Sequence, residues 1–70
     1  MGEGEYGISA GQRFRARGAA PVLWEVAVVY RHPWEVTPHV RLHRVDAPAD
    51  MKTIALATLQ DERYFAPAQG

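Results

Sequence analysis

The sequence has no cysteine, a single lysine and a single serine among its 70 residues. Without cysteine there is no disulfide, no thiolate metal site and no cysteine nucleophile, and the chain fits a reducing compartment such as the cytoplasm. The lone serine, Ser9, lies in a glycine-rich stretch with no catalytic motif around it, so serine hydrolysis is not indicated. A domain of this size must then be held together by packing alone.

Further absences exclude other classes of function. No apolar run approaches the ~20 residues of a membrane helix. The first residues are acidic and glycine-rich rather than basic and then apolar, which argues against a secretory signal. No glycine-rich phosphate loop follows a strand pattern. We therefore expect a protein that is not an enzyme, has no cofactor and does not enter membranes.

Charge is balanced overall but unevenly distributed along the chain. Residues 11–45 contain six arginines and two glutamates, whereas residues 1–10 and 46–70 are both net acidic. The arginine-rich middle predicts a surface that faces anions, while the net charge of zero argues against a nucleic-acid coat protein.

Alternating apolar and polar residues predict β-strands. The longest alternating stretch, residues 21–31, predicts a strand with one buried face, formed by Val22, Trp24, Val26, Val28 and Tyr30. Shorter strands are predicted over residues 12–17, 39–44, 52–56 and 63–66, with one helical turn over 58–62. Their inward-pointing residues are predicted to be Phe14, Ala16, Val40, Leu42, Ile54 and Leu56.

Residues 50–65 allow a second interpretation. Asp50 could cap a helix, and the apolar spacing from Met51 to Leu59 would suit one. That alternative is an α+β fold, a three-stranded antiparallel sheet with a C-terminal helix. We prefer the all-β arrangement, because two long strands alone leave their apolar face open and further strands would close a barrel over it.

The order of these elements resembles an SH3-like small barrel, the group that includes Tudor-type and KOW-type domains. The resemblance is carried by Trp-Glu-Val at 24–26, Pro-His-Val-Arg-Leu at 38–42, Lys-Thr-Ile at 52–54, and Leu-Gln-Asp at 59–61 before Tyr64-Phe65. It implies a five-stranded barrel over residues 11–66. Residues 1–10, which are rich in glycine, and residues 67–70 are expected to be disordered tails. The layout also resembles short bacterial proteins for which no activity is established. The chain has no Ala-Leu-Tyr-Asp-Tyr-type motif, so the resemblance does not imply proline-rich peptide binding.

An arginine face is the first candidate binding feature. Arg13, Arg15 and Arg17 share one side of a predicted strand, and Arg41 and His43 could extend that surface. Combined with an aromatic platform, such a face suits single-stranded RNA or DNA. The plainer interpretation is that the arginines protect an edge strand from aggregation.

Trp34 is the second candidate, because it lies in a loop between Pro33 and Pro38. An exposed tryptophan ringed by arginine is typical of protein-interaction hot spots. The plainer interpretation has Trp34 folding back to seal the barrel end. We expect a non-catalytic binding or accessory module, with a protein partner preferred and single-stranded nucleic acid as the alternative.

The histidines do not predict a metal site. His39 and His43 lie four residues apart, which on a strand separates them by ~13 Å. Two ligands of one zinc ion lie within ~4 Å of each other. His32 lies across the intervening loop. We expect no bound metal.

Overall fold

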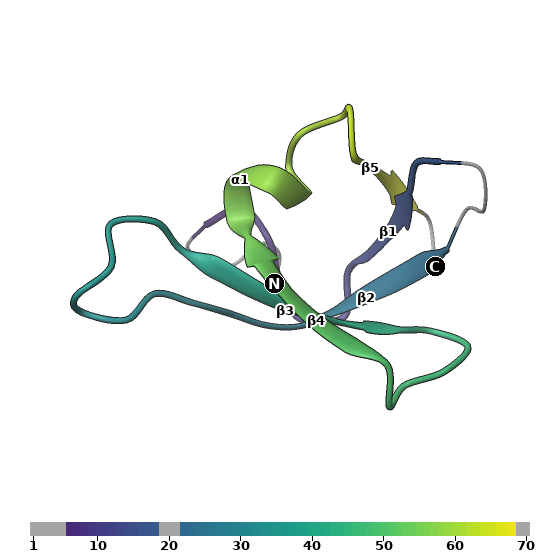
Figure 1. Ribbon diagram of the computed structural model, residues 1–70, viewed down its shortest axis with the longest axis horizontal. Helices are drawn as coiled ribbons and strands as arrows, with labels where there is room; N and C mark the ends of the chain where they lie inside the picture. Colours follow the sequence, from purple (N-terminus) through teal and green to yellow (C-terminus); the bar gives the residue numbers. More distant parts are fainter. Residues whose placement is uncertain (1–5, 19–21, 69–70) are drawn as a thin grey trace.

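Five strands and one short helical turn form the structure (Figure 1), a computed structural model that describes residues 6–18 and 22–68. The elements are β1 Arg13–Ala16, β2 Leu23–Tyr30, β3 His39–Arg44, β4 Met51–Ala55, α1 Leu56–Leu59 and β5 Phe65–Ala68. The strands are antiparallel, in the order β4-β3-β2-β1-β5. The sheet curls into a half-barrel, with α1 above its open side (Figure 1). The predicted small all-β fold is confirmed.

The apolar core lies on the inner face of the curled sheet. Alternation predicts it correctly in β1 and β3: Phe14 is buried, and Val40 and Leu42 are fully buried on either side of the exposed Arg41. Trp24 of β2 is also buried, as predicted. Residues directly opposite each other on antiparallel strands have side chains on the same face of the sheet. The strand register therefore determines, across all five strands, which side chains face the core and which face outward.

The second half of β2 departs from the prediction because of a bulge. Val26 lies opposite Leu42, but the next paired residue, Val28, lies opposite Arg41. Ala27 is thus an extra residue, and every later side chain of β2 changes face. Val28 is 42% exposed on the outer face, whereas its neighbour Val29 packs against the core. The prediction that Val28 and Tyr30 lie on the buried face is wrong for this reason.

Residues 50–65 form strand and turn rather than a long helix. β4 pairs with β3 over its full length, from Met51 opposite His43 to Ala55 opposite His39. The chain then makes a single helical turn, α1, which begins two residues earlier than predicted and buries Leu56 and Leu59. The three-stranded α+β alternative is therefore wrong, because the register of β4 against β3 overrides the helical propensity of the segment.

The segment before β1 belongs to the folded unit. Ile8 is only 7% exposed and lies in the core cluster, with Tyr6 packed against that cluster. The Gly11 amide donates to the Val26 carbonyl oxygen at 2.8 Å, which extends the pairing of β1 with β2. The prediction of a disordered tail over 1–10 is wrong for residues 6–10, and residues 1–5 lie outside the described part.

The C-terminal boundary of the folded unit also lies closer to the end of the chain than predicted. β5 continues to Ala68, so residues 67 and 68 are part of the sheet rather than of a tail. Residues 69 and 70 lie outside the described part of the chain. The closing strand also begins two residues later than predicted, at Phe65, which is buried.

Candidate binding surface

The outer face beside the bulge has a shallow hollow with a volume of about 400 Å³. Val28 and Arg41 lie opposite each other on β2 and β3 and line part of it. The full lining consists of Val28, Tyr30, Arg31, His32, Pro33 and Arg41. Because the bulge turns Val28 and Tyr30 outward, the hollow exists only through the irregularity in β2.

The loop between β2 and β3, residues 31–38, borders this hollow. Glu35 makes three hydrogen bonds within the loop: its amide donates to the His32 carbonyl at 2.9 Å, its carboxylate accepts the His32 amide at 3.3 Å, and its carbonyl accepts Nη1 of Arg31 at 2.8 Å. At the end of the loop, the Pro38 carbonyl accepts the amide of Leu56 in α1 at 3.0 Å. These bonds fix the loop without burying its side chains.

Aromatic rings continue from β2 into the loop. The rings of Tyr30 and His32 meet edge to face with centroids 5.1 Å apart, and those of His32 and Trp34 stack at 4.6 Å with an interplanar angle of 3°. Trp34 is nevertheless 78% exposed, and Val36 is 94% exposed. The interpretation that Trp34 seals the barrel end is therefore wrong, because its ring stacks on His32 at the surface.

The predicted arginine face is divided rather than continuous. Glu25 separates two of its members: Nε of Arg13 lies 3.0 Å from Oε1 of Glu25, and Nε2 of His43 lies 3.6 Å from Oε2. Arg17 lies beyond the end of β1, where its Nε donates to the Glu62 carbonyl. Arg15 is exposed on β1, and its side chain makes no hydrogen bond or ion pair within residues 6–18 and 22–68.

β1 lies between β2 and β5, so the arginines do not protect an edge strand, as the plainer interpretation required. Only Arg41 of the predicted cations lies at the hollow beside the Trp34 loop. Tyr30, Arg31 and His32 were not predicted as site residues. The only sequence signal for these three residues is that they lie close to Trp34 along the chain. For Tyr30 this signal was outweighed, because the alternation of the strand predicted its side chain to be buried.

The histidines of β3 each face a glutamate. His39 Nδ1 is buried and lies 3.6 Å from Oε2 of Glu35, beyond hydrogen-bond distance. Nε2 of His43 lies 3.6 Å from Oε2 of Glu25. Among the residues described, no group of three or more histidine, aspartate or glutamate side chains is arranged to hold a metal ion. No described helix has the length and apolar character needed to cross a membrane.

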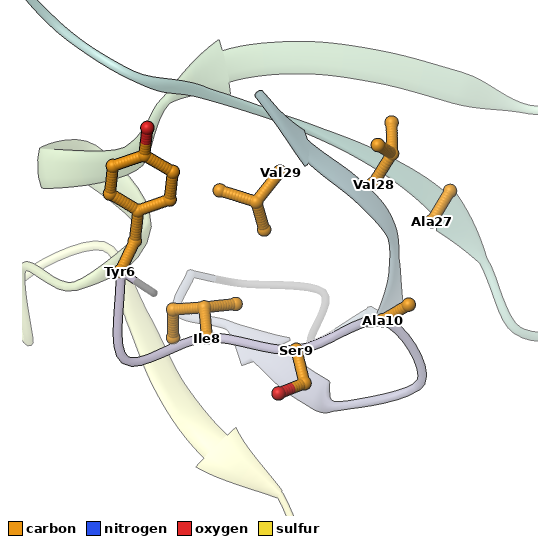
Figure 2. A pocket seen from close by; sticks show the side chains of 7 residues that line it. All are labelled: Tyr6, Ile8, Ser9, Ala10, Ala27, Val28 and Val29. Carbon is orange, nitrogen blue, oxygen red and sulfur yellow. The ribbon is translucent and has the colours of Figure 1, made fainter. Parts of the chain in front are cut away.

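A second cavity, of about 340 Å³, lies between residues 6–10 and the last part of β2. Figure 2 shows Tyr6, Ile8 and Val29 pointing toward one another across it, while the Ser9 hydroxyl points away. Its remaining lining residues are Ala10, Ala27 and Val28. The cavity has no charged lining, and the serine that borders it does not direct its oxygen inward, so it does not assemble a nucleophile and base.

Asp61 organises the turn before β5. Its Oδ1 accepts the Arg63 amide at 3.0 Å, and its Oδ2 lies 2.7 Å from Nη2 of Arg63. The guanidinium hydrogen bond, followed by the backbone one, lowers the pKa of Asp61 from 3.8 to about 2. These contacts stabilise the turn locally.

The lowered pKa gives a testable pH dependence. Because the folded-state pKa lies below the unfolded one, the stabilisation from ionised Asp61 is complete above about pH 4 and is lost as the pH falls through 2. Carboxyl-carbon NMR titration should give a midpoint near 2 for Asp61, and Arg63→Gln should raise it toward 3.8. A wild-type midpoint at the ordinary value would contradict this assignment.

Comparison of the chain with protein-family models, with curated proteins and with solved structures found no match in any of the three. The functional argument therefore rests on the geometry of the surface itself.

Proposed function

We propose that this chain is a non-catalytic protein-binding module, built as an SH3-like small barrel, whose contact surface is the 31–38 loop with the hollow beside it. The observation that carries the proposal is Trp34, which is 78% exposed although the loop around it is fixed by the hydrogen bonds of Glu35. Tryptophan, tyrosine and arginine are the residues that most often dominate binding energy at protein interfaces.

The order in the loop supports the proposal energetically. A partner that binds a mobile loop must offset the entropy lost when the side chains and backbone become fixed. Here Trp34 is already stacked on His32, and Glu35 is already hydrogen-bonded to Arg31 and His32 at the start of the loop. Val36, at 94% exposure, adds apolar area that is open to solvent. A preorganised, exposed apolar group of this kind favours a partner surface over a purely structural role.

Removal of the Trp34 ring tests the proposal. A displayed library of random 12-residue peptides would be selected on the immobilised protein, and the recovered peptides measured by calorimetry. We expect Trp34→Ala to weaken their binding by ~30-fold or more, the range of an interface hot spot. Tyr64→Ala is the matched control, because it removes another exposed aromatic ring from the turn before β5.

Two results would overturn the proposal: no specific peptide recovered on the wild-type protein, or recovered peptides that bind Trp34→Ala equally well. Circular dichroism of both variants separates loss of binding from loss of fold. Because Trp34 does not contribute to the buried core, we expect both variants to remain folded.

Single-stranded nucleic acid is the second candidate. The observation that favours it is the parallel stack of His32 and Trp34 beside Arg31 and Arg41, since bases stack on such rings and phosphates pair with arginine. The division of the other cations weakens it, because Arg13 already faces Glu25. Affinity for an oligonucleotide would fall steeply with salt, whereas an aromatic anchor on a protein partner would be much less affected.

A further inference from the structure

The two arginines at the hollow, Arg31 and Arg41, have no carboxylate partner among residues 6–18 and 22–68, unlike Arg13, Arg44 and Arg63. Arg13 faces Glu25, Arg44 faces Asp46 and Asp50, and Arg63 faces Asp61. The side chain of Arg41, in contrast, makes no hydrogen bond or ion pair within the described ranges 6–18 and 22–68. Arg31 donates to the carbonyl oxygen of Glu35, which leaves its positive charge without an anion.

The nearest loop carboxylate does not neutralise this pair. The Glu35 side chain accepts the His32 amide and lies 3.6 Å from Nδ1 of His39. The hollow therefore presents two uncompensated guanidinium groups on one surface. A guanidinium group binds a carboxylate through two parallel hydrogen bonds, a geometry that lysine does not offer.

Two other lining residues of the hollow are apolar. Val28, 42% exposed, and Pro33 line the same hollow, and the exposed Trp34 stands next to it on the loop. A ligand that satisfies this surface needs an anionic group for the arginines and an apolar side chain for the valine and tryptophan. Both requirements are met by a peptide that carries aspartate or glutamate next to an aliphatic residue.

We propose that the hollow binds an acidic segment of a protein partner, with a carboxylate at Arg31 and Arg41 and an adjacent apolar side chain against Val28 and Trp34. This inference rests on the proposed protein-binding function and specifies its partner. Val28, Pro33 and Val36 favour a peptide over nucleic acid, because they add aliphatic surface for an apolar side chain, whereas a base would use only the stacked rings of the surface. A nucleic-acid strand would also need a track of cations, and Arg13 and Arg17 are already occupied.

The test uses the tightest 12-residue peptide recovered by selection on the wild-type protein, together with versions in which its acidic residues become asparagine or glutamine, or lysine. We expect the parent peptide to contain aspartate or glutamate beside an apolar residue. The amide version should bind ~10-fold or more weakly, because a hydrogen bond between charged groups is lost. Arg41→Gln should remove most of that difference, and Arg41→Glu should reverse it, so that the lysine version binds best.

Arg15→Gln is the matched control, since Arg15 is also an exposed arginine without a partner among the described residues but lies on β1 away from the hollow. It should leave the affinity and the preference for acidic peptides unchanged. If the selected peptides require Trp34 but bind equally well as amides, the acidic-partner inference is wrong while the proposed function stands. If a 12-nucleotide single-stranded DNA binds more tightly than the peptide and Arg41→Gln abolishes its binding, the ligand is a phosphate backbone instead.

Discussion

Replacement of Val29 by aspartate is expected to unfold the protein, whereas the same replacement at the adjacent Val28 should leave it folded. Val29 packs against the core, so an aspartate there would bring an unpaired carboxylate into apolar surroundings, at a cost of several kcal/mol. Val28 faces outward and is 42% exposed, so its aspartate would remain hydrated. Urea titration followed by circular dichroism measures the difference.

The two variants are informative together because strict alternation along β2 predicts the opposite result, with Val28 buried and Val29 exposed. If Val28→Asp unfolds the protein and Val29→Asp does not, then Ala27 is not an extra residue and the hollow on the outer face does not exist. Val28→Asp has a second expected effect. Its carboxylate would enter the hollow lined by Arg41 and should reduce affinity for acidic peptides in a protein that is still folded.

Ile8→Ala should lower the free energy of unfolding by about 2–5 kcal/mol, the usual range for removing a buried isoleucine side chain. A core of this size rarely supplies more than ~3–5 kcal/mol, so a large share of the molecules would unfold. Ile8 is 7% exposed, in a segment whose composition suggests a tail. Chemical denaturation, monitored by circular dichroism, provides the measurement.

Val36→Ala is the reference for this experiment, because it shortens an aliphatic side chain that is 94% exposed. Its effect should stay within ~0.5 kcal/mol, as for most surface substitutions. If Ile8→Ala were equally mild, the packing of residues 6–10 on the core would be wrong.

The alternation of β1 and β3 was enough to predict their buried faces. Phe14, Val40 and Leu42 are surrounded by polar neighbours, so only one face can be apolar. In β2 both parities contain apolar residues, because the strand includes Ala27 and Val29 as well as Val26 and Val28. The pattern then cannot reveal an extra residue, and the bulge is set by pairing with β3 rather than by β2 itself.

The N-terminal segment was misjudged for a related reason. Four of the residues from Tyr6 to Gly11 are small, namely Gly7, Ser9, Ala10 and Gly11, and this composition is typical of a tail. Ile8 is held in the core by pairing of the following residues with Val26, a contact between positions far apart along the chain. The composition of a short segment does not reveal a pairing partner that lies far away along the chain.

The candidate site was predicted in part. Trp34 and Arg41 were predicted from an aromatic residue in a loop and a cation on an outward strand position, and both lie at the proposed surface. Arg13 and His43 were predicted for the same surface, but the register places Glu25 opposite both of them. Which cations are left without a carboxylate depends on strand register, which one sequence does not determine.

The two tryptophans of the chain lie in opposite environments. Trp24 is 7% exposed, with the Lys52 ammonium 4.3 Å from its ring centroid, while Trp34 is 78% exposed and stacked on His32. Their fluorescence should therefore differ: Trp24 emits from an apolar site that a dissolved quencher cannot reach, and Trp34 emits from water. A quencher such as iodide would reduce the fluorescence of Trp34 in the loop and leave that of Trp24 in the core unchanged. The protein thus carries two natural optical reporters, one for its fold and one for its proposed contact surface, and neither requires a dye.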